Sequence, residues 1–115
     1  MQPNRLEREL SAVIDGLEQE LRRVQLWELE PPSAHLLESS QPFCVDTLAL
    51  PQWLQWLLIP KIRRILAGDG VLPTRSAISP YAAEYFEHLD DGDALLALIE
   101  RLDGLLRHQP GARAH

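Results

Sequence analysis

Along the first quarter of the chain, apolar residues recur at spacings of three and four, and charged residues occupy many of the positions between them. This spacing is typical of an amphipathic α-helix that covers a core with one apolar face. Asn4 lies just before the first apolar position and is the expected N-cap, while Pro31 sets the latest point at which the helix can end. The apolar face consists of Leu6, Leu10, Val13, Leu17, Leu21 and Val24.

The segment 41–62 carries a denser apolar pattern, which predicts a buried central helix with neighbours on more than one flank. Asp46 or Thr47 is an expected N-cap, and Pro51 suits the first turn of this helix. Pro60 has no N–H to donate to the backbone, so we expect the helix to kink at this residue. Two adjacent apolar sides are expected, one formed by Trp53, Trp56, Leu57 and Pro60 and the other by Leu54, Leu58, Ile62 and Ile65.

Two further helices are predicted in the second half of the chain. The glycines at 68 and 70 are expected to end the central helix, and the Ser79-Pro80 pair is expected to begin a short one. Leucine and isoleucine recur at helical spacing between 95 and 106 and predict a final helix, and no segment shows the alternation of a strand. The predicted fold is therefore all-α, a four-helix bundle-like single domain over residues 1–108, followed by a flexible C-terminal tail at 109–115.

Composition is that of an ordinary globular domain. The 115 residues are 45% hydrophobic and 24% charged, and we expect neither a signal peptide nor a membrane span. The formal charge of −6 argues against a general nucleic-acid-binding role, which needs a basic surface. The one cysteine, Cys44, excludes an internal disulfide and fits a reducing compartment. We therefore expect a cytoplasmic protein with no membrane partner.

Short motifs spread over most of the chain carry a family resemblance. They are Gln41-Pro42-Phe43, Asp46-Thr47, Trp53-Leu54-Gln55-Trp56-Leu57, Ile59-Pro60, Leu72-Pro73 and Pro80-Tyr81. With these motifs the sequence resembles the YqcC-like family of small bacterial all-helical proteins. The resemblance implies a bundle-like domain of unknown molecular function, in a family whose members sometimes carry the name tRNA pseudouridine synthase C. Pseudouridine synthases are larger α/β enzymes with a catalytic aspartate in a strand-rich core, and this sequence predicts no strands.

No residue pattern indicates a catalytic, cofactor-binding or metal-binding site. Asp46 lies close to Cys44, but a thiolate needs a neighbouring base or cation to activate it, and capping explains Asp46 more simply. Most of the remaining aspartates, Asp103 among them, belong to an acidic stretch unsuited to RNA. The histidines lack the spacing of metal ligands and are expected in loops or on the surface; they are His35, His88, His108 and His115.

Seven residues are candidates for an interaction surface. The basic ones, with Arg75 nearby, suit a phosphate, an RNA or an acidic partner, although cations near the end of a helix also stabilise its dipole without any ligand. The aromatic ones either line an apolar pocket or fill the core, and core packing is the simpler explanation. An exposed ring among them would favour a partner-binding groove. The candidates are Trp53, Trp56, Lys61, Arg63, Arg64, Tyr81 and Tyr85.

The sequence supports three hypotheses about function. The first is a non-enzymatic cytoplasmic interaction or accessory domain with an unidentified protein partner, because a well-specified core is combined with no catalytic constellation. The second is an accessory factor associated with tRNA pseudouridine modification, which contacts tRNA or a tRNA-modifying enzyme. The third is a small apolar ligand binder that uses the aromatic bundle core. The oligomeric state is left open.

Overall fold

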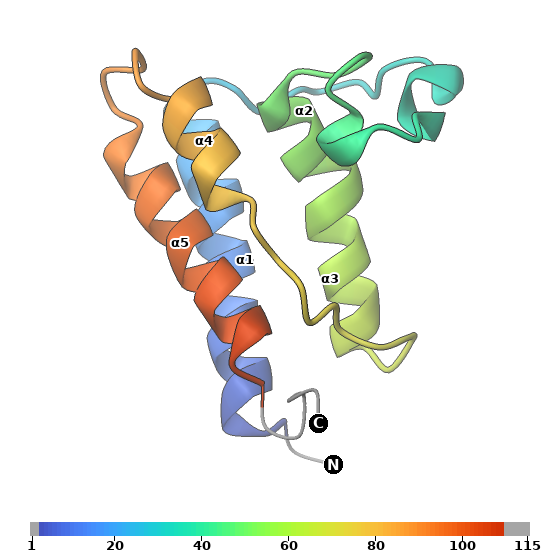
Figure 1. Cartoon of the computed structure of the whole chain (residues 1–115), viewed down its shortest axis with the longest axis vertical. Coiled ribbons are helices and arrows are strands. Elements are labelled where there is room, and N and C mark those ends of the chain that lie inside the picture. The colour runs from blue at the N-terminus through green and yellow to red at the C-terminus, as the bar shows by residue number, and fades with distance from the viewer. Residues whose placement is uncertain (1–2, 110–115) are drawn as a thin grey trace.

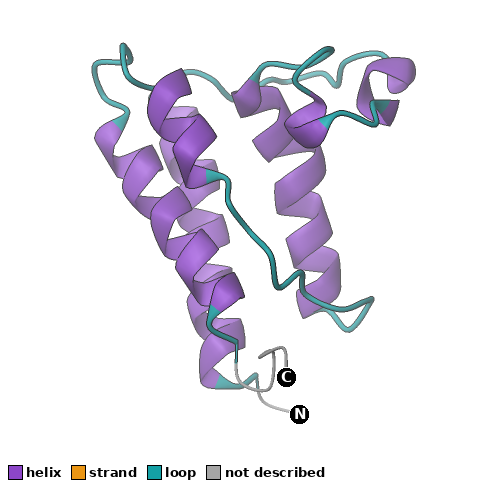
Figure 2. Cartoon of the chain, in the orientation of Figure 1, coloured by secondary structure: helices purple, strands orange, loops and turns teal. Residues whose placement is uncertain are grey.

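Helices and their connecting segments make up the whole of the part described by this computed structural model, residues 3–109 (Figure 2). The helices are α1 (Arg5–Arg23), α2 (Leu50–Trp53), α3 (Ile59–Leu66), α4 (Ser79–Tyr85) and α5 (Asp93–Arg107). A π-helical turn, Leu54–Leu58, joins α2 to α3, so that 50–66 form one central helix. Two short 3₁₀ turns, Ala34–Glu38 and Pro42–Cys44, precede it. The prediction of an all-α fold with four helices is confirmed.

The helices pack as a bundle around α1. Helix α5 lies alongside α1, α4 lies against α5, and α3 contacts another side of α1 (Figure 1). None of the helices in the described part of the chain is long and apolar enough to cross a membrane. The largest fully buried side chains come from three helices and meet in one core; they are Leu10, Ile14, Leu17, Leu21, Leu50, Leu54, Ile59, Ile62, Leu95, Ile99, Leu102 and Leu106.

Helix α1 begins as the sequence predicts. The side chain of Asn4 accepts a hydrogen bond from the Glu7 N–H at 2.8 Å, and the Asn4 N–H donates to the Glu7 carboxylate at 3.0 Å. This reciprocal pair satisfies two backbone groups that would otherwise lack a partner in the first turn. On the apolar face, Gly16 allows close packing of α5, because a Cβ at this position would lie 3.3 Å from a methyl carbon of Leu98.

The predicted N-cap of the central helix is wrong. The helix begins at Leu50, and neither Asp46 nor Thr47 caps it. Asp46 instead accepts a hydrogen bond from the Ser39 hydroxyl, and the Thr47 hydroxyl donates to the Leu36 carbonyl at 2.7 Å. Both residues therefore hold the two 3₁₀ turns together. Capping at Asp46 or Thr47 fails because the chain makes one more turn before the helix begins.

The predicted irregularity at Pro60 occurs in the turn that precedes it. The Ile59 N–H donates to the Leu54 carbonyl, five residues back, where a regular α-helix would use a four-residue spacing. Pro60 cannot supply the next N–H, so the helix loses a regular bond at the same place. Within the widened turn, Gln55 is buried while Trp56 stays half-buried.

The elements of the second half lie where the sequence predicts them. Helix α3 ends at Leu66, and Gly68 and Gly70 follow with φ of 104° and 117°, values that favour glycine. The expectation of a flexible tail at 109–115 falls on residues outside the described part, apart from Gln109. The side-chain amide of Gln109 donates to the Pro73 carbonyl at 2.7 Å and to the Leu106 carbonyl at 2.8 Å.

Candidate functional site

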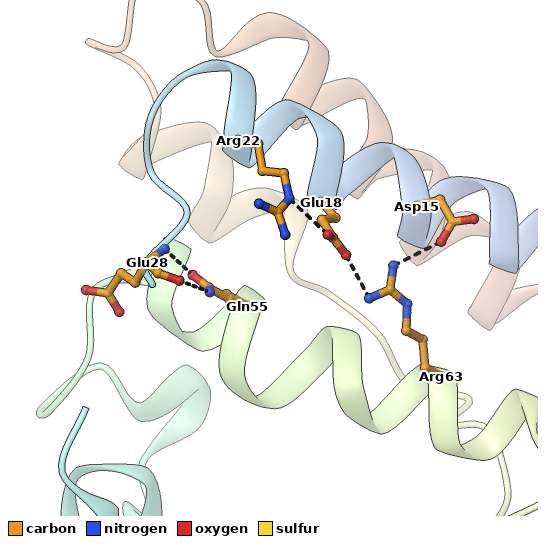
Figure 3. A network of polar contacts seen from close by, with 6 residues as sticks. All are labelled: Asp15, Glu18, Arg22, Glu28, Gln55 and Arg63. Carbon is orange, nitrogen blue, oxygen red and sulfur yellow. Dashed lines mark hydrogen bonds and ion pairs between the residues drawn. The ribbon is translucent and has the colours of Figure 1, made fainter. Parts of the chain in front are cut away.

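The loop after α1 is fastened to the central helix by a buried glutamine. Gln55 is 4% exposed, and its amide nitrogen donates to the Glu28 carbonyl while its amide oxygen accepts from the Glu28 N–H, both at 2.7 Å (Figure 3). The Glu28 carboxylate accepts from the Trp56 indole N–H at 2.9 Å and from Gln52 at 3.1 Å. Trp56 is therefore a half-buried anchor for this loop, not the fully buried core residue of the simpler interpretation.

Arg63 bridges α3 to α1. Its guanidinium donates to Asp15 at 2.9 Å and to Glu18 at 2.8 Å, and Glu18 also accepts from Arg22 at 3.0 Å (Figure 3). Partial burial raises the pKa of Glu18, but the hydrogen bonds and charges of Arg63 and Arg22 outweigh it and hold the pKa below its usual value. Burial likewise lowers the pKa of Arg63, and its two acidic partners raise it overall. Arg63 thus has a structural role, because both of its acidic partners lie on α1.

A groove on another side of the central helix collects the remaining candidate cations. It has a volume of about 600 Å³, is open to solvent, and lies between α3, the segment 39–44 and the segment 73–78. The described residues that line it include no aspartate or glutamate. We call it the basic groove and define it by six of its lining residues: Phe43, Trp53, Leu57, Lys61, Arg64 and Arg75.

The three cations of the basic groove differ from the other cations of the molecule. Among the ten lysines and arginines in the described part, seven contact a carboxylate or a backbone carbonyl of the protein. Within residues 3–109, Lys61, Arg64 and Arg75 are the three whose side chains make no ion pair or hydrogen bond, and all three line the groove. Cations without protein partners are available to an anionic ligand.

Aromatic rings extend the basic groove toward α4. The Phe43 ring meets Trp53 edge-on at 5.0 Å between centroids and stacks on Tyr81 at 5.4 Å. Tyr81 in turn meets Tyr85 at 6.0 Å. Tyr85 is 41% exposed, and partial burial together with neighbouring Tyr81 raises the pKa of its hydroxyl. The exposed ring favours the partner-binding interpretation over complete core packing for this part of the aromatic set.

The seven candidate residues therefore lie on two faces. Trp53, Lys61 and Arg64 line the basic groove, with Tyr81 and Tyr85 beyond it on α4. Trp56 and Arg63 line a different pocket of about 440 Å³, beside the loop that is hydrogen-bonded to Gln55. Sequence spacing grouped Arg63 with Lys61 and Arg64 because the three are close in the chain, but on a helix Arg63 points about 200° away from Lys61 and about 100° away from Arg64.

The sequence pattern did not single out Asp103, which is buried. Asp103 is 1% exposed and accepts a hydrogen bond from the Ser76 hydroxyl at 2.5 Å and from the Ser79 N–H at 2.7 Å. Its assignment to the exposed acidic stretch is therefore wrong. The signal was its spacing, since Asp103 lies four residues after Ile99 and three before Leu106, on the buried face of α5. Asp103 fixes the segment that forms one wall of the basic groove.

The described residues contain no group of three or more histidine, cysteine, aspartate or glutamate side chains that could hold a metal ion. Cys44 is buried, whereas Asp46 is exposed and bonded to Ser39. The described part of the chain is a small helical bundle with a basic, partly apolar groove.

The chain belongs to the DUF446 family, whose description is tRNA pseudouridine synthase C; the family model matches residues 9–105. The YqcC-like resemblance is thereby confirmed. The chain is 37% identical to the uncharacterised protein YqcC of Escherichia coli over 94 residues, which cover 80% of this chain and 85% of that protein. It is 33% identical to an uncharacterised protein of Haemophilus influenzae over 92 residues, covering 80% and 87%.

A solved structure has the same fold. The solution NMR structure of YqcC from E. coli matches with a TM-score of 0.79 and 31% sequence identity, covering 96% of this chain and 95% of that one. A protein of Pectobacterium carotovorum named tRNA pseudouridine synthase C is 33% identical over 57 residues. That match covers 50% of this chain but 15% of the named protein, so most of that protein has no counterpart in this match.

Proposed function

We propose that this chain is a non-enzymatic accessory domain that binds a partner protein through the basic groove. One observation carries the proposal, the convergence of Lys61, Arg64 and Arg75 on one groove although none of them has a partner among the described residues. Cations brought together without carboxylates repel one another, and an anionic ligand relieves that repulsion. The half-buried rings of Phe43 and Trp53 add the apolar area typical of the centre of a protein interface.

The residue types in the groove favour binding over catalysis. Among the described residues its lining offers no histidine or carboxylate to move a proton, and the buried Cys44 thiol has no base among its bonded neighbours there. The relatives that match over most of their own length are uncharacterised proteins. The relative that carries the synthase name matches over only 15% of its length. The single cysteine of the sequence supports a cytoplasmic location.

A second candidate function is an accessory role in tRNA pseudouridine modification. It is favoured by the 57-residue match to the Pectobacterium protein named tRNA pseudouridine synthase C and by the description of the family. Under this candidate, the partner protein is the synthase. The third sequence hypothesis, an apolar ligand within the bundle core, gains little support, because the basic groove is open and carries three cations.

Photo-crosslinking in the native cell tests the proposed function. A photoreactive amino acid at Leu57, which lines the basic groove, is compared with the same amino acid at the exposed Ala97 of α5. We expect a discrete crosslinked protein from position 57 that is missing from position 97. Identification of a pseudouridine synthase in that product selects the second candidate. Crosslinks to RNA alone, or the same products from both positions, would overturn the proposal.

A further inference from the structure

We propose that the occupant of the basic groove is an extended acidic peptide segment of the partner protein, with one aromatic or large aliphatic side chain between carboxylates. This inference rests on the proposed function and specifies the chemistry of the partner. The groove supplies two kinds of contact, cations from two of its lining segments and apolar side chains, and an occupant that matches both needs negative charge and an apolar anchor.

The cations come from two of the segments that line the groove. Lys61 and Arg64 are three residues apart on α3 and therefore share a face of that helix. Arg75 comes from the segment between α3 and α4, whose residues 73–78 also line the groove. Side chains of successive residues in an extended peptide point to opposite sides, so consecutive carboxylates present charge to α3 and to the segment 73–78 at once. Arginine binds carboxylates through two parallel hydrogen bonds, which favours this chemistry further.

The apolar part of the groove is held in place by an unusual backbone. Phe43 and Cys44 have φ of 56° and 51°, a left-handed conformation that is strained for non-glycine residues. This conformation places the Phe43 ring against both Trp53 and Tyr81. Phe43, Trp53 and Leu57 stay half-buried within the described molecule, so their remaining surface is available to a side chain of the partner. Aromatic anchors of this kind dominate binding at protein interfaces.

A nucleic acid fits these features less well than an acidic peptide. Affinity for RNA or DNA rests on a basic surface that neutralises many phosphates, whereas here the chain carries −6 overall and the basic groove contributes three cations. The surface of α4 and of the turn that follows it is acidic, because Glu84, Glu87 and Asp90 are exposed there. A polyanion longer than the groove meets this repulsion, whereas a short acidic segment remains within the groove.

A binding measurement on the full chain tests the inference. The probe is a fluorescein-labelled peptide, Glu-Asp-Glu-Trp-Leu-Asp-Glu, measured by fluorescence anisotropy at low and physiological salt. We expect binding that weakens with salt and falls about tenfold or more in the variant Lys61→Gln, Arg64→Gln, Arg75→Gln. The variant Arg5→Gln, Arg8→Gln, Arg101→Gln removes the same charge from residues outside the groove and should bind like the original chain.

Two altered peptides and one charge-preserving variant test the contributions of charge and apolar contact separately. A peptide with glutamine and asparagine in place of its acids, and one with serine in place of tryptophan and leucine, should each bind about tenfold more weakly. The variant Lys61→Arg, Arg64→Lys, Arg75→Lys keeps the charges and should bind more tightly than the glutamine variant, which separates loss of charge from loss of fold. Equal loss in the charge-matched variant outside the groove, or no binding of the acidic peptide, would overturn the inference.

Two other occupants are outcomes of the same experiment. Tighter binding of a labelled single-stranded RNA, lost in the three-cation groove variant, would replace the acidic peptide with nucleic acid. A concentration-dependent dimer in sedimentation that the same variant abolishes would assign the groove to a second copy of the chain. A crosslinked partner protein without peptide binding overturns the acidic segment while the proposed function stands. Peptide binding without any crosslinked partner overturns the proposed function instead.

Discussion

At the scale of single residues, buried polar side chains hold the irregular segments by pairing with backbone groups. Gln55 binds both the N–H and the carbonyl of Glu28, and Asp103 binds the Ser79 N–H and the Ser76 hydroxyl. A buried backbone group without a partner is costly, so these segments leave the helices and still satisfy their polar atoms. In the described part of the chain, no buried side-chain nitrogen or oxygen lacks a hydrogen-bond partner.

The first prediction tests the fastening of the loop by Gln55. Gln55→Met keeps the size and flexibility of the side chain but leaves the N–H and carbonyl of Glu28 without their partners. We expect the free energy of unfolding to fall by about 2–3 kcal/mol, measured by urea denaturation. Gln19→Met, at an exposed position of α1, should change it by less than about 0.5 kcal/mol. A loss at Gln55 no larger than at Gln19 would contradict the assigned role.

Individual residues also show where sequence reasoning stopped. The capping pair Asn4 and Glu7 was within reach, because its spacing is local. Trp56 and Asp46 were misplaced because their partners, Glu28 and Ser39, lie in segments without helical periodicity. Periodicity specifies which face a residue occupies on a helix, and it says nothing of where an irregular loop returns to that helix.

At the scale of elements, the sequence predicted the helices and their breaks better than the joins between them. The starts at Ser79 and the breaks at Gly68 and Gly70 follow from local backbone preferences. The widened turn Leu54–Leu58 depends on both Pro60 and the burial of Gln55, and the second of these is a tertiary effect. The basic groove combines three segments, so its lining was only partly accessible from the pattern along one helix.

The second prediction concerns the contact between α1 and α5 at Gly16. Alanine there gains about 1 kcal/mol of helix propensity, but its Cβ would lie 3.3 Å from one Leu98 methyl carbon and 3.4 Å from the other. We expect Gly16→Ala alone to change the free energy of unfolding by less than about 0.5 kcal/mol, and to stabilise a Leu98→Ala background by about 1 kcal/mol. Equal effects in the two backgrounds, measured by urea denaturation, would show that Leu98 does not oppose the methyl group.

The third prediction concerns the ion bridge between α1 and α3. The pKa of Glu18 is below its usual value, so its ionised form contributes stability that is present above that value and is lost as pH falls through the lowered pKa. Arg63→Gln should therefore cost about 0.5–1 kcal/mol at neutral pH, discounted for the exposure of Asp15, and much less near about pH 3. Denaturation of both proteins across this range measures the difference. Arg5→Gln, on an exposed pair, should show little change, and a difference that grows on acidification would contradict the bridge.

At the scale of the whole molecule, the distribution of charge separates structural cations from those of the basic groove. Arg63 and Arg101 join elements by pairing with acids on α1, while Lys61, Arg64 and Arg75 remain without partners in the described part. The net charge of −6 does not show which cations are paired with acids and which are not. The sequence shows the basic residues at 61–64 as one local cluster. Only the packing of α1 against α3 separates Arg63, which pairs with acids, from its two neighbours.

The last prediction concerns the activity in the family description. Purified chain alone should form no pseudouridine on tRNA, because that chemistry needs an aspartate in a pocket that holds a flipped-out nucleotide. Asp46 is exposed and bonded to Ser39, and both carboxylate oxygens of the buried Asp103 are already bonded. Mass spectrometry of tRNA digests measures the product. A change in yield when the chain is added to a pseudouridine synthase would favour the accessory role, whereas turnover by the chain alone that is lost in Asp46→Ala or Asp103→Asn would establish an enzyme.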